Sequence, residues 1–403
     1  MKKEIRSDLT SKNKIADSIN IVSKAVLAYE REPQKTEQQE DIKMKEVVVV
    51  SGVRLPVGSY GGSLKDITAI DMGAMVVKEA VKRAGIQPSD VDEVVIGQVG
   101  EVAENGFIAR AVSLKAGMPK ETTAYSVNRQ CGSGLQSIAE AVMEIQTGQA
   151  DVVIDILTWP LDGNHNGVTA ENVAEKYHVT REEQDAFAVR SHQRACKAIK
   201  EGKFKDEILP VELKDRKGNI TIFDTDEGPR EGQSMEKLAK LRPCFVKGGT
   251  VTAANSSSLN DGAAAVVVMS KEKAEELGVT PKMKIEGYAI AGFDAELMGY
   301  SPKFSSEKLA NKLGVDLKSI DMFEINEAFA SQAYAVSRDL GLDPEKVNIY
   351  GGGISIGHPI GATGAMLTVK VMYELMRTDK KDAMISMCIG GGQGISMYFT
   401  KCE

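Results

Sequence analysis

Aromatic residues, histidines and long apolar runs are scarce in this sequence. Only 5% of its 403 residues are aromatic, and four are histidine. No stretch reaches the roughly 18 consecutive apolar residues that a membrane-spanning helix needs, so we expect no membrane association. The net charge is −7 and no long basic cluster occurs, which argues against nucleic acids and anionic lipid surfaces as partners.

The cysteines fit neither a disulfide framework nor a metal site. Their number is odd, and they are scattered along a long chain: Cys131, Cys196, Cys244, Cys388 and Cys402. Secreted disulfide scaffolds are short and usually carry an even number of cysteines. A zinc site needs paired cysteines or a cluster of cysteine with histidine. We therefore expect free thiols, no bound metal, and a reducing compartment, the cytoplasm.

Glycine is plentiful, with 38 residues, and apolar runs alternate with amphipathic ones. The pattern predicts strands over residues 46–52, 91–97, 122–127, 151–157, 284–291, 321–326, 347–350 and 382–388. It predicts helices over residues 70–84, 105–117, 132–147, 180–201, 306–313, 328–340 and 361–377. Strands separated by helices in this way indicate an α/β fold, with a mainly parallel sheet and helices on its faces.

The second half of the chain repeats the layout of the first. The string "YSVNRQCGSGLQSIAEAV" places Cys131 at a glycine-rich turn between a strand and a helix. The string "NIYGGGISIGHPIGATGAMLTV" places His358 at the matching turn. We interpret this as an internal duplication. Two stacked copies related by a pseudo-twofold axis would bring both turns to one crevice at the strand ends, where open α/β sheets bind ligands.

Cys131 is the first candidate for chemistry. It follows a strand and begins a helix, where the positive end of the helix dipole favours a thiolate. Gly132 and Gly134 allow a tight bend and the close approach of a ligand. The alternative interpretation is a buried, inert cysteine at a helix start.

His358 and Cys388 are the second and third candidates, because each also lies at a glycine-rich strand end. Each has a structural alternative: a histidine satisfied by backbone groups, and a small buried hydrophobic residue. Together, two thiols and one histidine at three such turns predict an acyl-transfer site. One thiol would be the nucleophile, the histidine its base, and the second thiol an acid and base.

Two polar segments complete the candidate site. Asn326 follows the strand "DMFEI", where its amide could donate to an oxyanion or cap the helix that follows. The loop at residues 255–258, "NSSS", could bind an amide-rich ligand or simply face solvent.

These residues carry a resemblance to a known family. The strings "NRQCGSGLQ", "NEAFASQ", "GGGISIGHPIGATGA" and "CIGGGQG" are similar to motifs of the thiolases, and most of all to those of biosynthetic acetyl-CoA acetyltransferases. The likeness runs from Met44 to Thr400. It implies a five-layer αβαβα sandwich of two duplicated halves, a homodimer, acyl-CoA substrates, and no cofactor beyond the coenzyme A thioesters.

The resemblance also implies a role for each site residue. Cys131 takes the acetyl group from one acetyl-CoA, His358 activates that thiol, and Cys388 removes a proton from the second acetyl-CoA. Asn326 would hold a water in one oxyanion hole, and the backbone N–H groups of Cys131 and Gly390 would form another. The positions that match substrate contacts are Ser257 and His165 for the pantetheine arm, Arg230 for the nucleotide, and Phe329 and Met298 for the acyl pocket.

The expected domains follow from the same resemblance. Residues 44–168 and 250–280 would form the N-terminal thiolase half, and residues 281–403 the C-terminal half. Residues 169–249 would be an inserted, shortened region that covers the substrate. Residues 1–43 are charge-dense and fit neither a secretory signal nor a transit peptide, so we expect an extension that is either disordered or not native.

The sequence departs from the family pattern at one place. The string "ADVVIDILTWPLDGNHNGVTAEN" runs almost directly between two family motifs, so a segment near the active site is missing, and Asn166 replaces the usual methionine. Three interpretations stay open. The protein condenses two acetyl-CoA to acetoacetyl-CoA and catalyses the reverse thiolysis, or it is a degradative 3-ketoacyl-CoA thiolase, or it is a catalytically impaired CoA-binding homologue.

Overall fold

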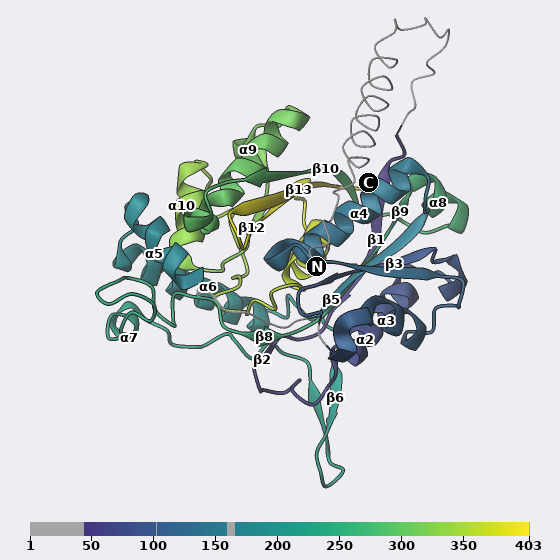
Figure 1. The fold of residues 1–403 in the computed structure, drawn as a ribbon, viewed down its shortest axis with the longest axis horizontal. Helices are drawn as coiled ribbons and strands as arrows, with labels where there is room; N and C mark the ends of the chain where they lie inside the picture. The colour runs from purple at the N-terminus through teal and green to yellow at the C-terminus, as the bar shows by residue number, and fades with distance from the viewer. Residues whose placement is uncertain (1–43, 102, 159–165, 403) are drawn as a thin grey trace, which may run out of the picture. The chain divides into compact units, whose positions relative to one another are not determined.

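The computed structural model describes residues 44–101, 103–158 and 166–402 (Figure 1). The predicted extension at residues 1–43 and the predicted pantetheine contact His165 lie outside the described residues. The strands are β1 Val47–Arg54, β2 Gly58–Ser59, β3 Glu93–Gln98, β4 Thr123–Val127, β5 Val152–Thr158, β6 Val211–Lys214, β7 Ile220–Phe223, β8 Asn260–Asp261, β9 Ala264–Ser270, β10 Met283–Gly292, β11 Phe323–Ile325, β12 Asp382–Ile389 and β13 Gln393–Lys401. The α-helices are α2 Ala69–Ala84, α3 Ile108–Lys115, α4 Ser133–Thr147, α5 Asn166–Lys176, α6 Arg181–Lys200, α7 Met235–Leu238, α8 Lys271–Leu277, α9 Ser301–Leu313, α10 Ala330–Asp339 and α11 Thr363–Arg377.

The strand order confirms the duplication, but the expected mainly parallel sheet is wrong, because five of the eight neighbouring strand pairs are antiparallel. Nine strands are hydrogen-bonded in the order β11-β12-β13-β10-β1-β9-β5-β3-β4. In the first half, β3 and β5 are parallel, β9 is antiparallel to β5, and β1 is antiparallel to β9. In the second half, β11, β12, β13 and β10 repeat the same sequence of directions. Only two residue pairs, Val48 with Lys284 and Val49 with Met283, join the halves through β1 and β10.

The helices and the two half-sheets form the five expected αβαβα layers, and the apolar core lies between them (Figure 1). One cluster holds side chains of α4 and α11 together with one face of each half-sheet. A second cluster packs α2 and α3 against the other face of the first half-sheet. A third packs α9 and α10 against the other face of the second half-sheet. Strand β1 is buried along its whole length, as expected for the apolar run "VVVV" in a sheet covered on both faces.

One predicted strand is wrong. Residues 347–350 make only isolated bridges, from Val347 to Phe323 and from Ile349 to Gly351. Asn348 has φ of 49°, in the left-handed region, so the backbone cannot stay extended. Its side-chain amide replaces the lost ladder: Oδ1 accepts the N–H of Ile325 at 2.8 Å, and Nδ2 donates to the Ile325 carbonyl at 2.9 Å.

The middle region is built around α6, whose predicted bounds are confirmed. Thr180 caps its start and forms a capping box with Glu183, and Glu201 caps its end. Strand β9 lies between β1 and β5 in the first half-sheet, and all seven of its residues are buried. The hairpin of β6 and β7 forms a separate two-stranded sheet that projects from the body of the molecule (Figure 1). The structure does not test the domain boundaries proposed for this region, and they stay predictions.

Candidate active site

The two matching turns meet where the first residues of α4 and α11 contact each other. The N–H of Gly134 donates to the carbonyl of Gly361 at 3.2 Å. A Cβ atom on Gly134 would lie 2.7 Å from that carbonyl oxygen, and one on Gly364 would lie 2.3 Å from the Leu135 nitrogen. Glycine is therefore required at both positions for the helices to approach. This contact brings the turns that carry Cys131 and His358 to one place, as the sequence predicts.

Cys131 lies in the short turn that leads into α4 and is only 7% exposed. Burial raises the pKa of its thiol to about 11, although the backbone N–H groups of Gly390 and of Cys131 itself act in the opposite direction. The N–H groups at the helix start act in the expected direction, but burial has the larger effect on the pKa. Cys131 is a protonated thiol at neutral pH and needs a base to become a nucleophile.

His358 is a neutral base with a defined tautomer. Its Nδ1 is 2.6 Å from Thr363 Oγ1, and the Thr363 hydroxyl donates its own hydrogen to the Pro359 carbonyl at 2.9 Å. The threonine oxygen must then accept, so Nδ1 carries the proton and Nε2 presents a lone pair. Burial lowers the pKa of His358 to about 4. The imidazole is thus unprotonated at neutral pH and can accept a proton at Nε2.

Asn326 sits beside that lone pair, directly after β11. Its Nδ2 is 3.3 Å from His358 Nε2. Its Oδ1 is buried and has no hydrogen-bond partner among the described residues. The cap interpretation is wrong, because the next helix, α10, begins at Ala330 with Phe329 as its cap residue. An unpaired buried acceptor next to the base is a position that can hold a water molecule.

Cys388 lies near the end of β12 and is fully buried. Burial raises the pKa of its thiol far above the ordinary value, and negative charge on Cys131 raises it further. The two sulfurs are thus close enough to interact electrostatically. Cys388 packs with Met298, Ala328 and Phe329, so the structure brings together the second thiol and the two residues predicted for the acyl pocket.

The remaining predicted substrate contacts lie on two loops. The N–H of Ser257 donates to the carbonyl of Ala328 at 2.9 Å, which sets the serine loop beside Phe329. Arg230 is exposed, and its backbone N–H donates to His192 Nδ1 at 3.2 Å. Arg230 lies just beyond Gly228, whose Cβ would be 2.3 Å from the Ser355 carbonyl. Its loop therefore packs against the turn that leads to His358.

Three residues of the site were missed by the sequence analysis. Thr363 orients His358, as described above. Asn260 Oδ1 accepts the backbone N–H of His358 at 3.0 Å, and a Cβ on Gly357 would lie 2.6 Å from Asn260. Phe245 stands edge-to-face with Phe329 at 6.1 Å between ring centroids. Asn260 could have been found only from knowledge that "NSSSLND" and "IGHPIGAT" lie in contact. A single sequence does not contain that information.

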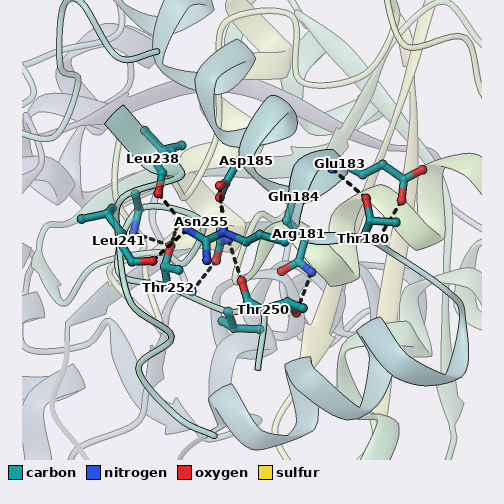
Figure 2. Close-up of polar contacts among 12 residues, drawn as sticks. Thr180, Arg181, Glu183, Gln184, Asp185, Leu238, Leu241, Thr250, Thr252 and Asn255 are labelled. Atoms are coloured by element: carbon teal, nitrogen blue, oxygen red, sulfur yellow. Dashed lines mark hydrogen bonds and ion pairs between the residues drawn. The ribbon is translucent and has the colours of Figure 1, made fainter. Parts of the chain in front are cut away.

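A polar network fixes the serine loop to the start of α6 (Figure 2). Asp185 accepts from Arg181 Nε at 2.7 Å and from Asn255 Nδ2 at 2.9 Å. Arg181 also donates to the carbonyls of Leu238 and Leu241. Asn255 Oδ1 accepts the N–H of Thr252 at 2.7 Å. Asn255 and Ser256 are buried, so this part of the loop does not face solvent, and its shape is set by these bonds.

Replacing Asp185 by alanine should therefore loosen the serine loop. The change leaves donors of Arg181 and Asn255 without their acceptor, which we expect to cost about 2–3 kcal/mol of unfolding free energy. Urea denaturation measures that loss. KM for the substrate should rise more than kcat falls, because the loop carries Ser257, a predicted substrate contact. Glu182→Ala changes an exposed acid in the same turn and should alter neither quantity. Equal stability of the two variants would contradict the prediction.

Comparisons with known proteins place the site in a family context. The thiolase N-terminal domain family matches residues 47–156 and 155–272, and the thiolase C-terminal domain family matches residues 279–401. An acetyl-CoA acetyltransferase of Syntrophomonas wolfei is 44% identical over 391 residues, covering 88% of this chain and 98% of that protein. A β-ketothiolase of Cupriavidus necator is 44% identical over 392 residues, covering 89% and 99%.

Two solved structures are similar to this chain over 89% of its length. A crystal structure of an acetyl-CoA acetyltransferase of Bacillus anthracis has a TM-score of 0.85 and 41% identity, covering 89% of this chain and 99% of that one. A crystal structure of human mitochondrial 3-ketoacyl-CoA thiolase has a TM-score of 0.85 and 38% identity, covering 89% and 99%.

The alignment with the S. wolfei protein agrees with the predicted loss of a segment. The S. wolfei alignment spans 391 positions, whereas 88% of 403 residues is about 355, so about 36 positions have no counterpart in this chain. The N-terminal domain family matches in two pieces that meet at residues 155–156. That point lies in β5, at the string in which the sequence departs from the family pattern.

Proposed function

This chain belongs to the thiolase family, and from that premise we propose that it is an acetyl-CoA C-acetyltransferase. It would condense two acetyl-CoA to acetoacetyl-CoA and catalyse the reverse thiolysis. One observation carries the proposal: the turns that hold two buried thiols and a neutral histidine with an unprotonated Nε2 come together at the ends of α4, α11 and β12. These three side chains can supply the nucleophile, the base and the acid that formation and discharge of an acyl thioester require.

In the first half-reaction Cys131 becomes acylated. His358 Nε2 accepts the Cys131 proton, and the thiolate attacks the thioester carbonyl of acetyl-CoA. The tetrahedral oxyanion would be stabilised by His358 and by a water held at Asn326 Oδ1. Collapse forms the acetyl-Cys131 thioester and releases the CoA thiolate. Because burial keeps Cys388 protonated, Cys388 is suited to donate its proton to that leaving sulfur.

In the second half-reaction Cys388, now a thiolate, removes an α-proton from a second acetyl-CoA. The resulting enolate attacks the carbonyl carbon of acetyl-Cys131. The backbone N–H groups of Cys131 and Gly390, which face the Cys131 sulfur, are placed to stabilise the new oxyanion. Collapse forms acetoacetyl-CoA and expels Cys131, which recovers its proton from His358. Cys388 retains the proton from the second substrate, so the enzyme returns to its resting state.

The preference for acetyl-CoA is proposed from the relatives, which include acetyl-CoA acetyltransferases. Met298 is almost fully buried and packs beside Cys388 with Phe329, so these side chains are the proposed wall of the acyl pocket. A degradative thiolase acting on longer 3-ketoacyl chains is the alternative that the same test resolves.

We further propose a homodimer, a cytoplasmic location and no cofactor beyond the CoA thioesters. β4 is the last strand of the sheet order and leads directly to the Cys131 turn, so a second copy could pair at this edge and support the site. All five cysteines are free. Within the described ranges, no group of three or more His, Cys, Asp or Glu residues could hold a metal ion, and no helix is long and apolar enough to cross a membrane.

Mass spectrometry of the intact protein tests the function. After brief exposure to acetyl-CoA, a gain of one acetyl group is expected, followed by thiolysis that is faster with acetoacetyl-CoA than with longer 3-ketoacyl-CoA. Faster thiolysis of the longer substrates would identify the degradative alternative. A folded protein that gains no acetyl group and shows no thiolysis would be the impaired homologue, with the shortened β5 region as the cause.

The pH dependence of acylation should reflect the buried histidine. Because burial lowers the pKa of His358 to about 4, the base form persists well below the ordinary titration range near about 6.5. The value of kcat/KM for acylation should therefore stay nearly constant from about pH 8 down to about pH 5.5 and fall only on further acidification. The burst of CoA released from acetyl-CoA measures it. A fall of kcat/KM with its midpoint at about pH 6.5 would instead show that His358 is solvated.

A further inference from the structure

A buried lysine, Lys370, lies behind the active site and plays no part in the mechanism above. It sits on α11, two turns after Thr363, and is only 3% exposed. Its Nζ donates to Glu324 Oε2 at 2.9 Å and to the carbonyl of Gly351 at 2.5 Å. Burying a lysine side chain is costly unless the ammonium is fully paired. Burial of Lys370 at this cost therefore indicates a specific role for its ammonium.

Both partners of Lys370 lead directly to catalytic groups. Glu324 lies in β11, two residues before Asn326. Gly351 has φ of 76° and begins the glycine-rich turn that ends at His358. That turn is tightly packed: a Cβ on Gly353 would lie 2.8 Å from the carbonyl of Glu327 and 3.2 Å from Asn326 Oδ1. Movement of the turn would therefore move Asn326 and His358 relative to each other.

We propose that Lys370 is a positioning residue, whose ammonium ties β11 and the glycine-rich turn to α11 and so sets the contact between Asn326 and His358. This inference rests on the proposed function only for its kinetic readout. α11 also supplies Thr363, which orients the imidazole from the other side. Helix α11 thus holds the His358 ring through Thr363 and the backbone of the glycine-rich turn through Lys370.

The surrounding charges support a specific role for the ammonium. Glu324 is fully buried, and its Oε1 has no partner in the described part of the chain. Burial raises the pKa of Glu324 to about 7, and Lys370 opposes that rise while Glu327 and Glu207 add to it. One cavity of about 20 Å³ is lined both by Lys370 and by the buried pair of Arg54 and Glu207. Lys370 is the cation that pairs with Glu324.

Lys370→Met is the first variant to test. Displacement of His358 from Asn326 by a fraction of an ångström should lower kcat for thiolysis by about 10- to 100-fold, because catalysis depends on this geometry. KM should change little, since Lys370 contacts no predicted CoA residue. The rate of Cys131 alkylation by iodoacetamide should fall as well, because deprotonation by His358 limits it. Lys308→Met is the matched control: Lys308 also donates to a carbonyl from a helix, but at the surface.

A double variant separates positioning from simple charge balance. Lys370→Met combined with Glu324→Met replaces the ion pair by apolar side chains, a change that often leaves stability equal or higher. We expect the thermal midpoint to be lower than wild type in the single variant and equal to wild type in the double variant. In the double variant kcat and the alkylation rate should stay low, because no donor then holds the Gly351 carbonyl.

The remaining outcomes are also decisive. A wild-type rate constant in the folded single variant, or its full return in the double variant, would overturn the proposal. Failure of both variants to fold would show that Lys370 supports the fold as a whole and would overturn it too. Iodoacetamide alkylation requires no acyl-CoA, so an altered alkylation rate in a protein without thiolase activity would leave the inference standing and reject the proposed function alone.

Discussion

Cys131→Ala is expected to remove acyl-enzyme formation completely and to lower the rate of acetoacetyl-CoA thiolysis on the order of 10⁵-fold. The loss is large because no other nucleophile can take over. His358 is held by Thr363 and Asn326, and the turn that follows it contacts the start of α4, where Cys131 lies. Cys388 packs against the acyl pocket. Intact-protein mass after exposure to acetyl-CoA, together with steady-state thiolysis, measures both effects.

Stability and specificity controls make this result interpretable. Removing one buried sulfur costs about 1 kcal/mol, so the variant should remain folded in a thermal melt. Cys196→Ala changes a half-exposed thiol on α6 and should retain full activity. An acetyl adduct on the Cys131→Ala protein, or peptide mapping that places the wild-type adduct on another cysteine, would refute the assignment.

Cys388→Ala is expected to separate the two half-reactions. The acetyl-Cys131 adduct should still form, because the nucleophile, its base and the N–H groups around the sulfur remain. Condensation should fall by about 10³- to 10⁴-fold, the effect of losing a positioned acid and base. The high pKa that burial gives Cys388 is part of this expectation, since a thiol that is protonated at rest can act first as the acid.

A pre-steady-state experiment distinguishes the steps. Rapid mixing with acetyl-CoA should show a burst of one CoA per active site in Cys388→Ala and almost no acetoacetyl-CoA afterwards. Cys244→Ala removes an exposed thiol outside the site, and it should keep both steps. Condensation at the wild-type rate by Cys388→Ala would show that another group removes the α-proton.

The sequence allowed the duplication of the two halves and the meeting of the glycine-rich turns to be predicted, because glycine and apolar periodicity report local backbone geometry. It did not reveal the strand directions, which depend on pairings between distant segments. It did not allow the contacts of Thr363 and Asn260 with His358 to be predicted as functional. Asn260 reaches His358 across 98 residues, a contact that exists only after folding. The protonation state of Cys131 could not be predicted for a related reason: a helix terminus is visible in the sequence, whereas the burial that outweighs its effect on the pKa is not.

The strand at residues 347–350 failed for a different physical reason. "VNIY" has the composition of a strand, but Asn348 takes a left-handed backbone conformation and pairs with Ile325 through its side chain. A side-chain amide that replaces ladder hydrogen bonds leaves no periodic signal. Strand β13 had no counterpart among the predicted strands, because the preceding "IGGGQG" was interpreted only as a turn.

The pairing of β1 with β9 has a consequence for how the chain folds. Residue 47 pairs with residue 270 and residue 54 with residue 264, so the first half-sheet cannot close until the ribosome has made most of the chain. Contacts so distant in sequence make folding slow and leave apolar strands exposed in the meantime. The crevice further requires β12 and α11, from the last part of the chain. A nascent chain would therefore acquire its catalytic turns together, as a late and single event, and a chaperone would be most needed before residue 270 emerges.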